Sequence, residues 1–241
     1  MKVSEKIAQQ IVNIPEGDTF GYEQLSITKE DYLAAAKVLE RLQKKGILKK
    51  ISKGVFYKPE ISPFGELKPS EQEIMKPYLF EGGKRIAYVT GSYLYNQLGL
   101  TTQLTSGIKI ASRSKRIKIN TGALNASPVK SYADVDDANY QLLGFLDAMK
   151  DLKIIPDGDI KSSISIFCYR IGQLTNEEIE EMIKYALVYP PRVRALLGAI
   201  LEQLNRTKGI EKLKEKLNPL SHFKLGIKSS YLKSISNWNI Q

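Results

Sequence analysis

The stretch RLQKKGILKKISKGVFYKP, from Arg41 to Pro59, determines how the first part of this chain folds. Its opening residues continue a helical pattern, whereas ILKKI and GVFYKP are short runs rich in β-branched and aromatic residues, which is typical of strands. Gly46 ends the helical pattern, and Gly54 lies between the two runs, where it is free to adopt a turn conformation. The stretch therefore predicts a helix followed by a two-stranded β-hairpin.

Two more helical segments precede this element. Ile7, Ile11 and Ile14 recur at helical spacing, and the short segment FGYEQLS follows them. The segment TKEDYLAAAKVLERLQKKG then predicts a longer helix, whose buried side is expected to carry Tyr32, Ala35, Leu39 and Leu42. Three helices followed by a basic hairpin predict a winged helix-turn-helix.

The charge of this stretch indicates a polyanionic partner. Seven cations and no carboxylate lie between Arg41 and Pro59, and in a winged helix the third helix enters the DNA major groove while the hairpin follows the phosphates. We expect base contacts from the third helix and phosphate contacts from the hairpin. The predicted DNA contacts are Lys29, Lys37, Arg41, Lys44, Lys45, Lys49, Lys50, Lys53 and Lys58, with Lys37 and Arg41 at base edges. The alternative is a solvated basic face that binds a protein.

The composition agrees with a polyanion as partner. The chain of 241 residues has a formal net charge of +10, which attracts nucleic acids and anionic membrane surfaces. No apolar run approaches the ~20 residues of a membrane span, so we expect a cytoplasmic protein with no membrane partner. Cys168 and His222 are the only cysteine and histidine, which excludes an internal disulfide and a Cys/His zinc site.

The whole sequence predicts an α+β protein with three folded parts and one linker. A winged helix-turn-helix is expected over residues 1–60, a proline-containing linker over 61–69, a small mixed α/β domain over 70–172 and a helical C-terminal region over 173–241. In the last part, RVRALLGAILEQLNR presents a broad apolar face from Val193 to Leu204, which packs in a core or binds a partner. The basic segment after Pro219, with the lone Trp238, is expected to be loosely held.

A second basic surface is predicted in the α/β domain, because no Asp or Glu occurs from Gly82 to Ala133. The segment SRSKRIK either binds phosphate or RNA, or forms a solvated hairpin turn. Downstream, the aspartates of YADVDD are expected to cap a helix more than to bind a metal. The second basic surface consists of Lys109, Arg113, Lys115, Arg116 and Lys118.

The sequence lacks the common enzyme motifs, namely a Gly-rich P-loop, H-E-x-x-H and G-x-S-x-G. Gly91 and Ser92 form a turn like that of nucleotidyltransferases, which place two metal-binding carboxylates on the next strand. Here the next strand reads GIKIAS, and Lys109 stands where a carboxylate is needed. We therefore predict no catalytic residues, no metal and no cofactor.

The segments LERLQKKGILKKISKGVFYKP and YVTGSYLYNQLGLTTQ, with LLGFLDAMKDLKIIPD as a weaker third match, resemble the AbiEi-type antitoxins of bacterial abortive-infection toxin-antitoxin systems. The resemblance covers most of residues 1–157. It implies a transcriptional autorepressor that binds repeats in its own promoter. It also implies an antitoxin that opposes a co-encoded nucleotidyltransferase toxin in phage defence, without necessarily forming a tight complex with it.

Two other functions compete with this one. The apolar face around Leu196 and Leu204 would make the protein an interaction module if it binds a partner directly. The basic segment from Arg113 to Lys118 would serve as a track in an RNA-processing factor, although the missing carboxylate pair disfavours RNA processing.

Overall fold

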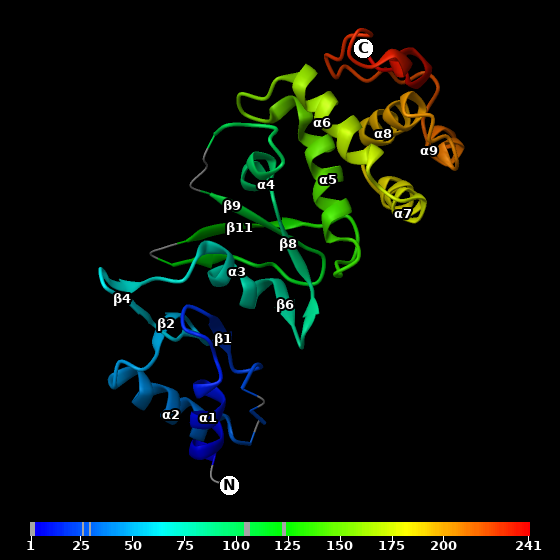
Figure 1. Cartoon of the computed structure of the whole chain (residues 1–241). Helices are drawn as coiled ribbons and strands as arrows, with labels where there is room; N and C mark the ends of the chain where they lie inside the picture. The colour runs from blue at the N-terminus through cyan, green and yellow to red at the C-terminus, as the bar shows by residue number, and fades with distance from the viewer. Residues whose placement is uncertain (1–2, 26, 29, 104–106, 122–123) are drawn as a thin grey trace. The chain divides into compact units, whose positions relative to one another are not determined.

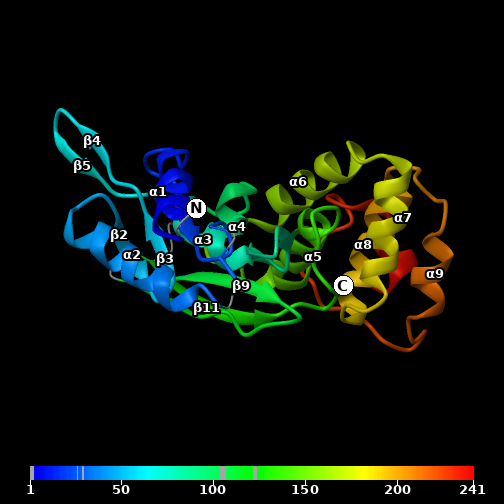
Figure 2. The same ribbon diagram turned by 90° about the horizontal axis from the view of Figure 1, so that it is seen from below.

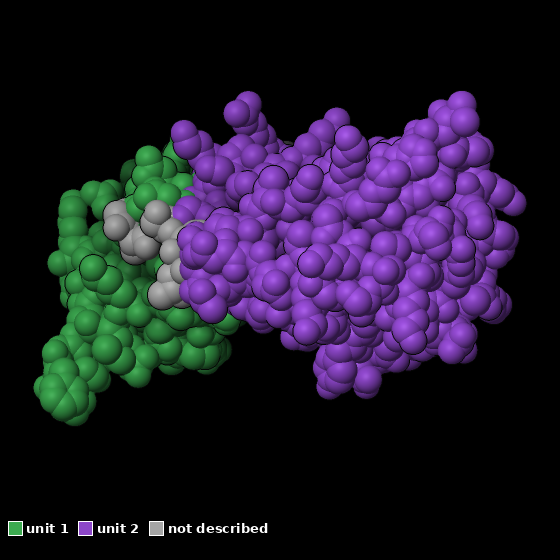
Figure 3. Space-filling model, turned by 90° about the horizontal axis from the view of Figure 1, so that it is seen from above, with its two compact units in different colours: residues 1–85, 119–125 green, residues 86–118, 126–241 purple. Residues whose placement is uncertain are grey.

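The computed structural model describes residues 3–25, 27–28, 30–103, 107–121 and 124–241. The chain is α+β and divides into two compact units, which Figure 3 colours separately. Unit 1 comprises Met1–Arg85 and Ile119–Asn125, and unit 2 comprises Ile86–Lys118 and Ala126–Gln241. Within the part of the chain just given, no helix is long and apolar enough to cross a membrane.

Unit 1 consists of short helices and small antiparallel sheets (Figure 1). Its first elements are α1 (Val3–Val12), β1 (Thr19–Gly21), α2 (Tyr32–Lys44), β2 (Lys49–Ser52) and β3 (Val55–Tyr57). They are followed by β4 (Glu60–Ser62), β5 (Gly65–Leu67), α3 (Glu71–Leu79), β6 (Phe80–Glu81), β7 (Lys84–Arg85) and, much later in the chain, β10 (Ile119–Asn120).

The core of unit 1 forms between α1, α2 and the sheet. Ile7 and Ile11 of α1 are buried with Leu39 of α2 and Phe20 of β1, as the helical spacing predicts. The expectation for Tyr32 was wrong, because this side chain is 46% exposed and its ring packs on the Tyr22 ring at 4.6 Å. The buried side of α2 is formed by Ala35, Val38 and Leu39, with Leu42 half-buried.

The predicted hairpin is present as β2 and β3, and a third strand completes its sheet. The strand order is β1-β3-β2, and both pairings are antiparallel. Gly54 has φ of +80° at the turn, a conformation that glycine adopts without steric penalty. The register shifts between Lys50 and Ser52, so β2 carries an irregularity at its end. Because β3 is central, β2 is an edge strand with exposed lysines.

The expected linker over residues 61–69 contains a second hairpin, formed by β4 and β5 with Ile61 paired to Glu66. Figure 2 shows this hairpin projecting from the other elements of unit 1. The unit also continues past the expected boundary, because α3 is held to the first sheet. The Thr19 hydroxyl donates to the Glu73 carbonyl at 2.5 Å. Pro59 and Pro69 therefore flank a hairpin whose turn contains Pro63, instead of marking a flexible connection.

Unit 2 combines a small sheet with a bundle of helices (Figure 1). Strand β8 (Ala87–Thr90) pairs antiparallel with β9 (Ile108–Ser112), and β9 pairs in parallel with β11 (Asn125–Lys130). The helices are α4 (Ser92–Gln97), α5 (Tyr140–Asp151), η1 (Leu152–Ile154), α6 (Ile160–Gly172), α7 (Asn176–Ala186), α8 (Pro191–Gln203), α9 (Ile210–Glu215) and η2 (Lys233–Trp238).

Helix α8 is the central helix of the unit 2 core. Leu196, Leu197, Ile200 and Leu201 have no exposed surface, so the apolar face packs in the core and is not available to a partner. The expectation of a loosely held C-terminal segment was wrong. Trp238 is 2% exposed, and its indole Nε1 donates to Glu202 of α8 at 2.6 Å. Burial of the large apolar indole stabilises the docking of this segment, although the segment is rich in lysines.

Gly198 provides the space that the Trp238 ring occupies, because a Cβ added at Gly198 would overlap ring atoms. We expect Gly198→Ala to lower the free energy of unfolding by about 1–3 kcal/mol through overpacking. Urea unfolding followed by the fluorescence of Trp238, the only tryptophan, measures this. The control is Gly172→Ala at the end of α6, where an added Cβ meets open space. Equal stability of the two variants would contradict the assignment.

Candidate nucleic-acid interface

The exposed side of α2 carries a row of basic residues. Lys37, Arg41 and Lys44 are spaced by four and three residues, which places them on one face of the helix. All three are exposed, because Ala35, Val38 and Leu39 occupy the opposite, buried side. Packing of this helix therefore presents the predicted DNA-contacting cations to solvent.

One carboxylate lies in this row. Glu40 Oε1 is 2.8 Å from Lys44 Nζ, and both side chains are mostly exposed. A hydrogen bond to Lys44 lowers the pKa of Glu40, and the same bond raises the pKa of Lys44. The two directions agree, as expected for an exposed ion pair. Lys37 and Arg41 keep exposed charges that are separate from this pair.

The edge strand β2 adds Lys49 and Lys50, both exposed. Lys49 Nζ lies 2.5 Å from Glu66 Oε2 on β5, and the hydroxyl of Tyr57 donates to the other oxygen of Glu66 at 3.1 Å. The hydrogen bond from Lys49 lowers the pKa of Glu66. The second hairpin thus brings a carboxylate to the first one, and Lys50 stays outside that ion pair.

The other predicted DNA contacts differ in their surroundings. Lys45 and Lys53 are exposed, the first after α2 and the second in the hairpin turn. Lys58 is half-buried, and its Nζ donates to the Ile14 carbonyl at 3.4 Å. This hydrogen bond makes Lys58 a connection between the sheet and the end of the first helical segment. Lys29 lies outside the described residues.

The second predicted basic surface lies in unit 2, on β9 and the segment that follows it. Arg113 donates to the Tyr132 carbonyl at 2.7 Å, and its Nε lies 3.6 Å from Asp134. The methylene groups of Lys109 pack on Gly91, which is the turn residue before α4. This packing explains why a side chain with a long aliphatic part follows the Gly91–Ser92 turn. The exposed members of the surface are Lys109, Arg113, Lys115, Arg116 and Lys118.

Of the aspartates before α5, Asp136 orders the turn that leads into the helix, but the N-cap residue is Asn139 and no side-chain cap hydrogen bond is present in the described structure, so the expected capping by these aspartates was wrong. The Asp136 carboxylate accepts hydrogen bonds from the backbone N–H groups of Ala138 and Asn139, each at 2.9 Å. Both N–H groups precede the first residue of α5, so these bonds hold the preceding turn. In the described ranges, no three His, Cys, Asp or Glu side chains come together as metal ligands would.

A buried polar cluster in unit 2 was missed from the sequence. Asp147 of α5 is 3% exposed, and its carboxylate accepts hydrogen bonds from the hydroxyls of Tyr88 at 2.9 Å, Thr90 at 2.8 Å and Tyr189 at 3.2 Å. Tyr95 donates to Asp151 at 2.7 Å beside this cluster. The motifs YVTG and LLGFLDAM contain three of these residues, Tyr88, Thr90 and Asp147, but their mostly apolar neighbours gave no indication of a polar contact.

The electrostatics of the cluster are dominated by burial. Burial raises the pKa of Asp147, while the charge of Lys150 and the hydrogen bonds from Thr90 and Tyr88 act in the opposite direction. Burial also raises the pKa values of Tyr88 and Tyr189, so both phenols stay protonated and donate. The cluster satisfies one buried carboxylate with neutral donors, and it ties β8 to α5 and Tyr189.

Together these features define an α+β protein with a basic helix-and-hairpin surface on unit 1. A model of the family of unknown function DUF6088 matches residues 6–127, and the chain belongs to that family. No curated protein matches the chain. Among solved structures, the crystal structure of the RV2827C protein from Mycobacterium tuberculosis is similar at 12% sequence identity and a TM-score of 0.42. This match covers 92% of the chain and 83% of that protein.

The raised pKa of Asp147 predicts a pH effect of known sign. The folded state holds the Asp147 proton more tightly than the unfolded state, whose aspartate titrates at about pH 3.9. The stabilising contribution is therefore complete below that pH and is lost as pH rises through the folded-state pKa. We expect the stability of Asp147→Asn, measured relative to wild type by urea unfolding, to improve as pH rises from about 4 to 7.

Asp159 supplies the matched control. Its carboxylate accepts a hydrogen bond from the Ser162 N–H, which lowers the pKa of Asp159. The stabilisation from Asp159 is present above the unfolded pKa and lost as pH falls, so Asp159→Asn should show the opposite trend. A difference between Asp147→Asn and wild type that does not vary with pH would contradict the assignment.

Proposed function

We propose that the protein is a DNA-binding transcriptional repressor whose unit 1 acts as a winged helix-turn-helix. The observation that carries the proposal is the row of Lys37, Arg41 and Lys44 on the exposed side of α2, followed directly by the basic edge strand β2. Before the hairpin, the described residues form α1, β1 and α2 where three helices were predicted, because FGYEQLS contributes strand β1 and a turn. The three-stranded sheet and the basic helix followed directly by a hairpin still support the motif. In this arrangement α2 is the recognition helix, and the β2–β3 hairpin is the wing.

The two parts of the surface have different expected roles. Arg41 has a planar guanidinium that bonds both acceptors of a guanine edge, so it serves base recognition from α2. Lys50 and Lys53 are flexible point charges at the hairpin, which suits phosphate contacts that do not depend on sequence. The lysines of β2 also protect an edge strand from pairing with other chains. That role alone would explain their presence, and a loss of DNA affinity on their substitution distinguishes DNA binding from it.

Two carboxylates modulate this surface. Glu40 and Glu66 hold Lys44 and Lys49, so these two lysines must exchange a carboxylate for a phosphate when DNA binds. An exposed ion pair contributes little stability, and the exchange therefore has a small free-energy cost. Once its lysine contacts DNA, each of the two carboxylates is repelled by the phosphates, which lowers the affinity for every DNA sequence alike.

We also propose an antitoxin function, which rests on the resemblance to AbiEi-type antitoxins. The partner is a co-encoded nucleotidyltransferase toxin, and the effect does not require a stable complex. Expression of the neighbouring open reading frame, with and without this protein, tests the proposal by colony formation. Growth arrest by the neighbour that this protein relieves is the expected result, and arrest that persists would contradict it.

Arg41→Ala should weaken binding to the protein's own upstream DNA by about 1–3 kcal/mol and reduce its preference over a scrambled duplex. Lys50→Ala should weaken both duplexes alike and lower the slope of log K against log salt by about one. Fluorescence anisotropy over a salt series measures both effects, with Lys161→Ala on α6 of unit 2 as a control of equal charge change. Unchanged affinity in Arg41→Ala would show that α2 does not face DNA.

Glu66→Gln should have the opposite effect. The variant removes a negative charge beside the wing and releases Lys49, so we expect DNA to bind about two- to fivefold more tightly at low salt. Glu215→Gln, an exposed position at the end of α9, is the control for a change in net charge. Equal gains in the two variants would indicate a general charge effect and remove Glu66 from the interface.

A further inference from the structure

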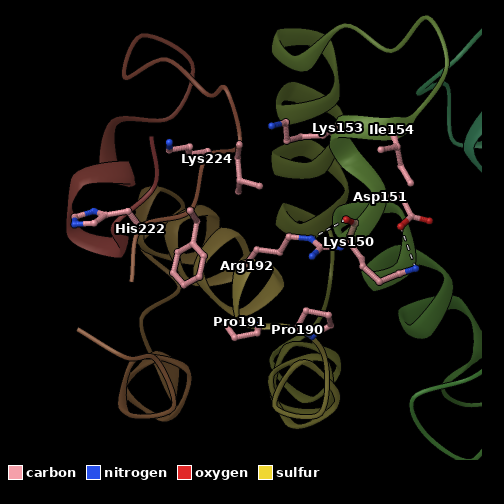
Figure 4. A pocket seen from close by; sticks show the side chains of 11 residues that line it. Lys150, Asp151, Lys153, Ile154, Pro190, Pro191, Arg192, His222 and Lys224 are labelled. Carbon is pink, nitrogen blue, oxygen red and sulfur yellow. Dashed lines mark hydrogen bonds and ion pairs between the residues drawn. The ribbon is translucent and has the colours of Figure 1, made fainter. Parts of the chain in front are cut away.

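Unit 2 contains a pocket of about 490 Å³ that the proposed DNA-binding surface does not include. Its walls come from the end of α5 with η1, from the start of α8, and from the C-terminal segment around Phe223 (Figure 4). This volume falls in the range of small-molecule sites, about 300–1,000 Å³. The pocket exists because the buried Trp238 holds the C-terminal segment against α8.

The charged groups that line the pocket are mostly cations. Lys150, Lys153, Arg192 and Lys224 lie on its walls together with a single carboxylate, Asp151. That carboxylate is already engaged, because Asp151 Oδ1 lies 3.0 Å from Lys150 Nζ and Asp151 Oδ2 accepts from Tyr95. The other three cations have no carboxylate partner among the described residues. The lining therefore favours an anionic ligand.

Arg192 is the best-oriented of these cations. Its Nε donates to the Lys150 carbonyl at 3.2 Å, which fixes the guanidinium between α8 and α5. No hydrogen bond in the described structure engages its two Nη groups, which are the pair that binds phosphate oxygens in a fork. Figure 4 shows Arg192 directed toward Lys150 on α5 and the Lys153 amino group directed toward the side of Lys224, whereas His222 points away.

The remaining wall is apolar. Pro190 and Pro191 line the pocket at the start of α8, and Phe223 and Leu225 line it from the C-terminal segment. Phe223 is half-buried, so part of its surface faces the pocket. A small inorganic anion would leave these side chains without a contact. A ligand with a phosphate and a flat, largely apolar group would use both walls, because bases stack on aromatic side chains.

We propose that this pocket binds a nucleoside phosphate. Its phosphate is bound by the Nη groups of Arg192, with Lys153 and Lys224 as further cations of the lining, and its base packs against the proline and Phe223 wall. This site is separate from the surface on α2 and β2, and it does not depend on DNA binding by unit 1.

Isothermal titration calorimetry of the full chain with adenosine 5′-monophosphate, adenosine and inorganic phosphate tests the proposal. Saturable binding of the monophosphate is expected, with weaker binding of each of its two parts alone. Arg192→Gln and Lys153→Gln should each weaken binding about tenfold or more, the effect of losing a charge-assisted hydrogen bond. Lys228→Gln, an exposed lysine outside the pocket lining, should bind like wild type.

Lys153→Gln keeps the test valid if Arg192→Gln disturbs folding, because Lys153 is exposed and forms no ion pair in the described structure. Absence of saturable binding by wild type would overturn the proposal, as would equal affinity of wild type, Arg192→Gln and Lys153→Gln. Phosphate that binds as tightly as the monophosphate would overturn the nucleoside assignment and leave a simple anion site.

Discussion

The burial of Ala35, Val38 and Leu39 against α1 and the first sheet is the constraint on which the basic surface depends. An α-helix has one orientation about its axis once its apolar side is packed, so this contact determines which residues face solvent. Lys37 and Arg41 then lie outward because they alternate with the buried residues at helical spacing. The positions of the charges follow from the positions of the apolar groups.

The same packing sets the position of the hairpin. Phe56 is buried in the unit 1 core and pairs with Phe20 of β1, so β3 is fixed in the middle of the sheet. β2 can then occupy only the outer edge, where lysines avoid the cost of burying a charge. Val55, Phe56 and Tyr57 are all buried, as expected for the central strand of a sheet that is covered on both faces.

The helices α1 and α2 and the β2–β3 hairpin could be predicted from local patterns, whereas β1, the β4–β5 hairpin and partners across the chain could not. The hairpin turn at Gly54 depends on neighbouring residues and occurs as the sequence predicts. Glu66 reaches Lys49 only because the expected linker folds into a hairpin, which depends on strand pairing. Trp238 and Asp147 were missed for the same reason, since their contacts join segments far apart in the sequence.

Availability of a cation, more than its presence, decides what a basic protein can bind. Arg192 and Arg194 lie two residues apart on α8, but Arg194 donates to the carbonyls of Leu187, Tyr189 and Lys216 through both Nη groups. It therefore links the end of α7 to the segment after α9 and has no fork left for a ligand. Arg192 uses only Nε, which fixes the group and leaves the fork open. Both arginines contribute equally to the net charge. Their hydrogen bonds show that Arg194 connects structural elements, whereas Arg192 keeps two donor groups for a ligand.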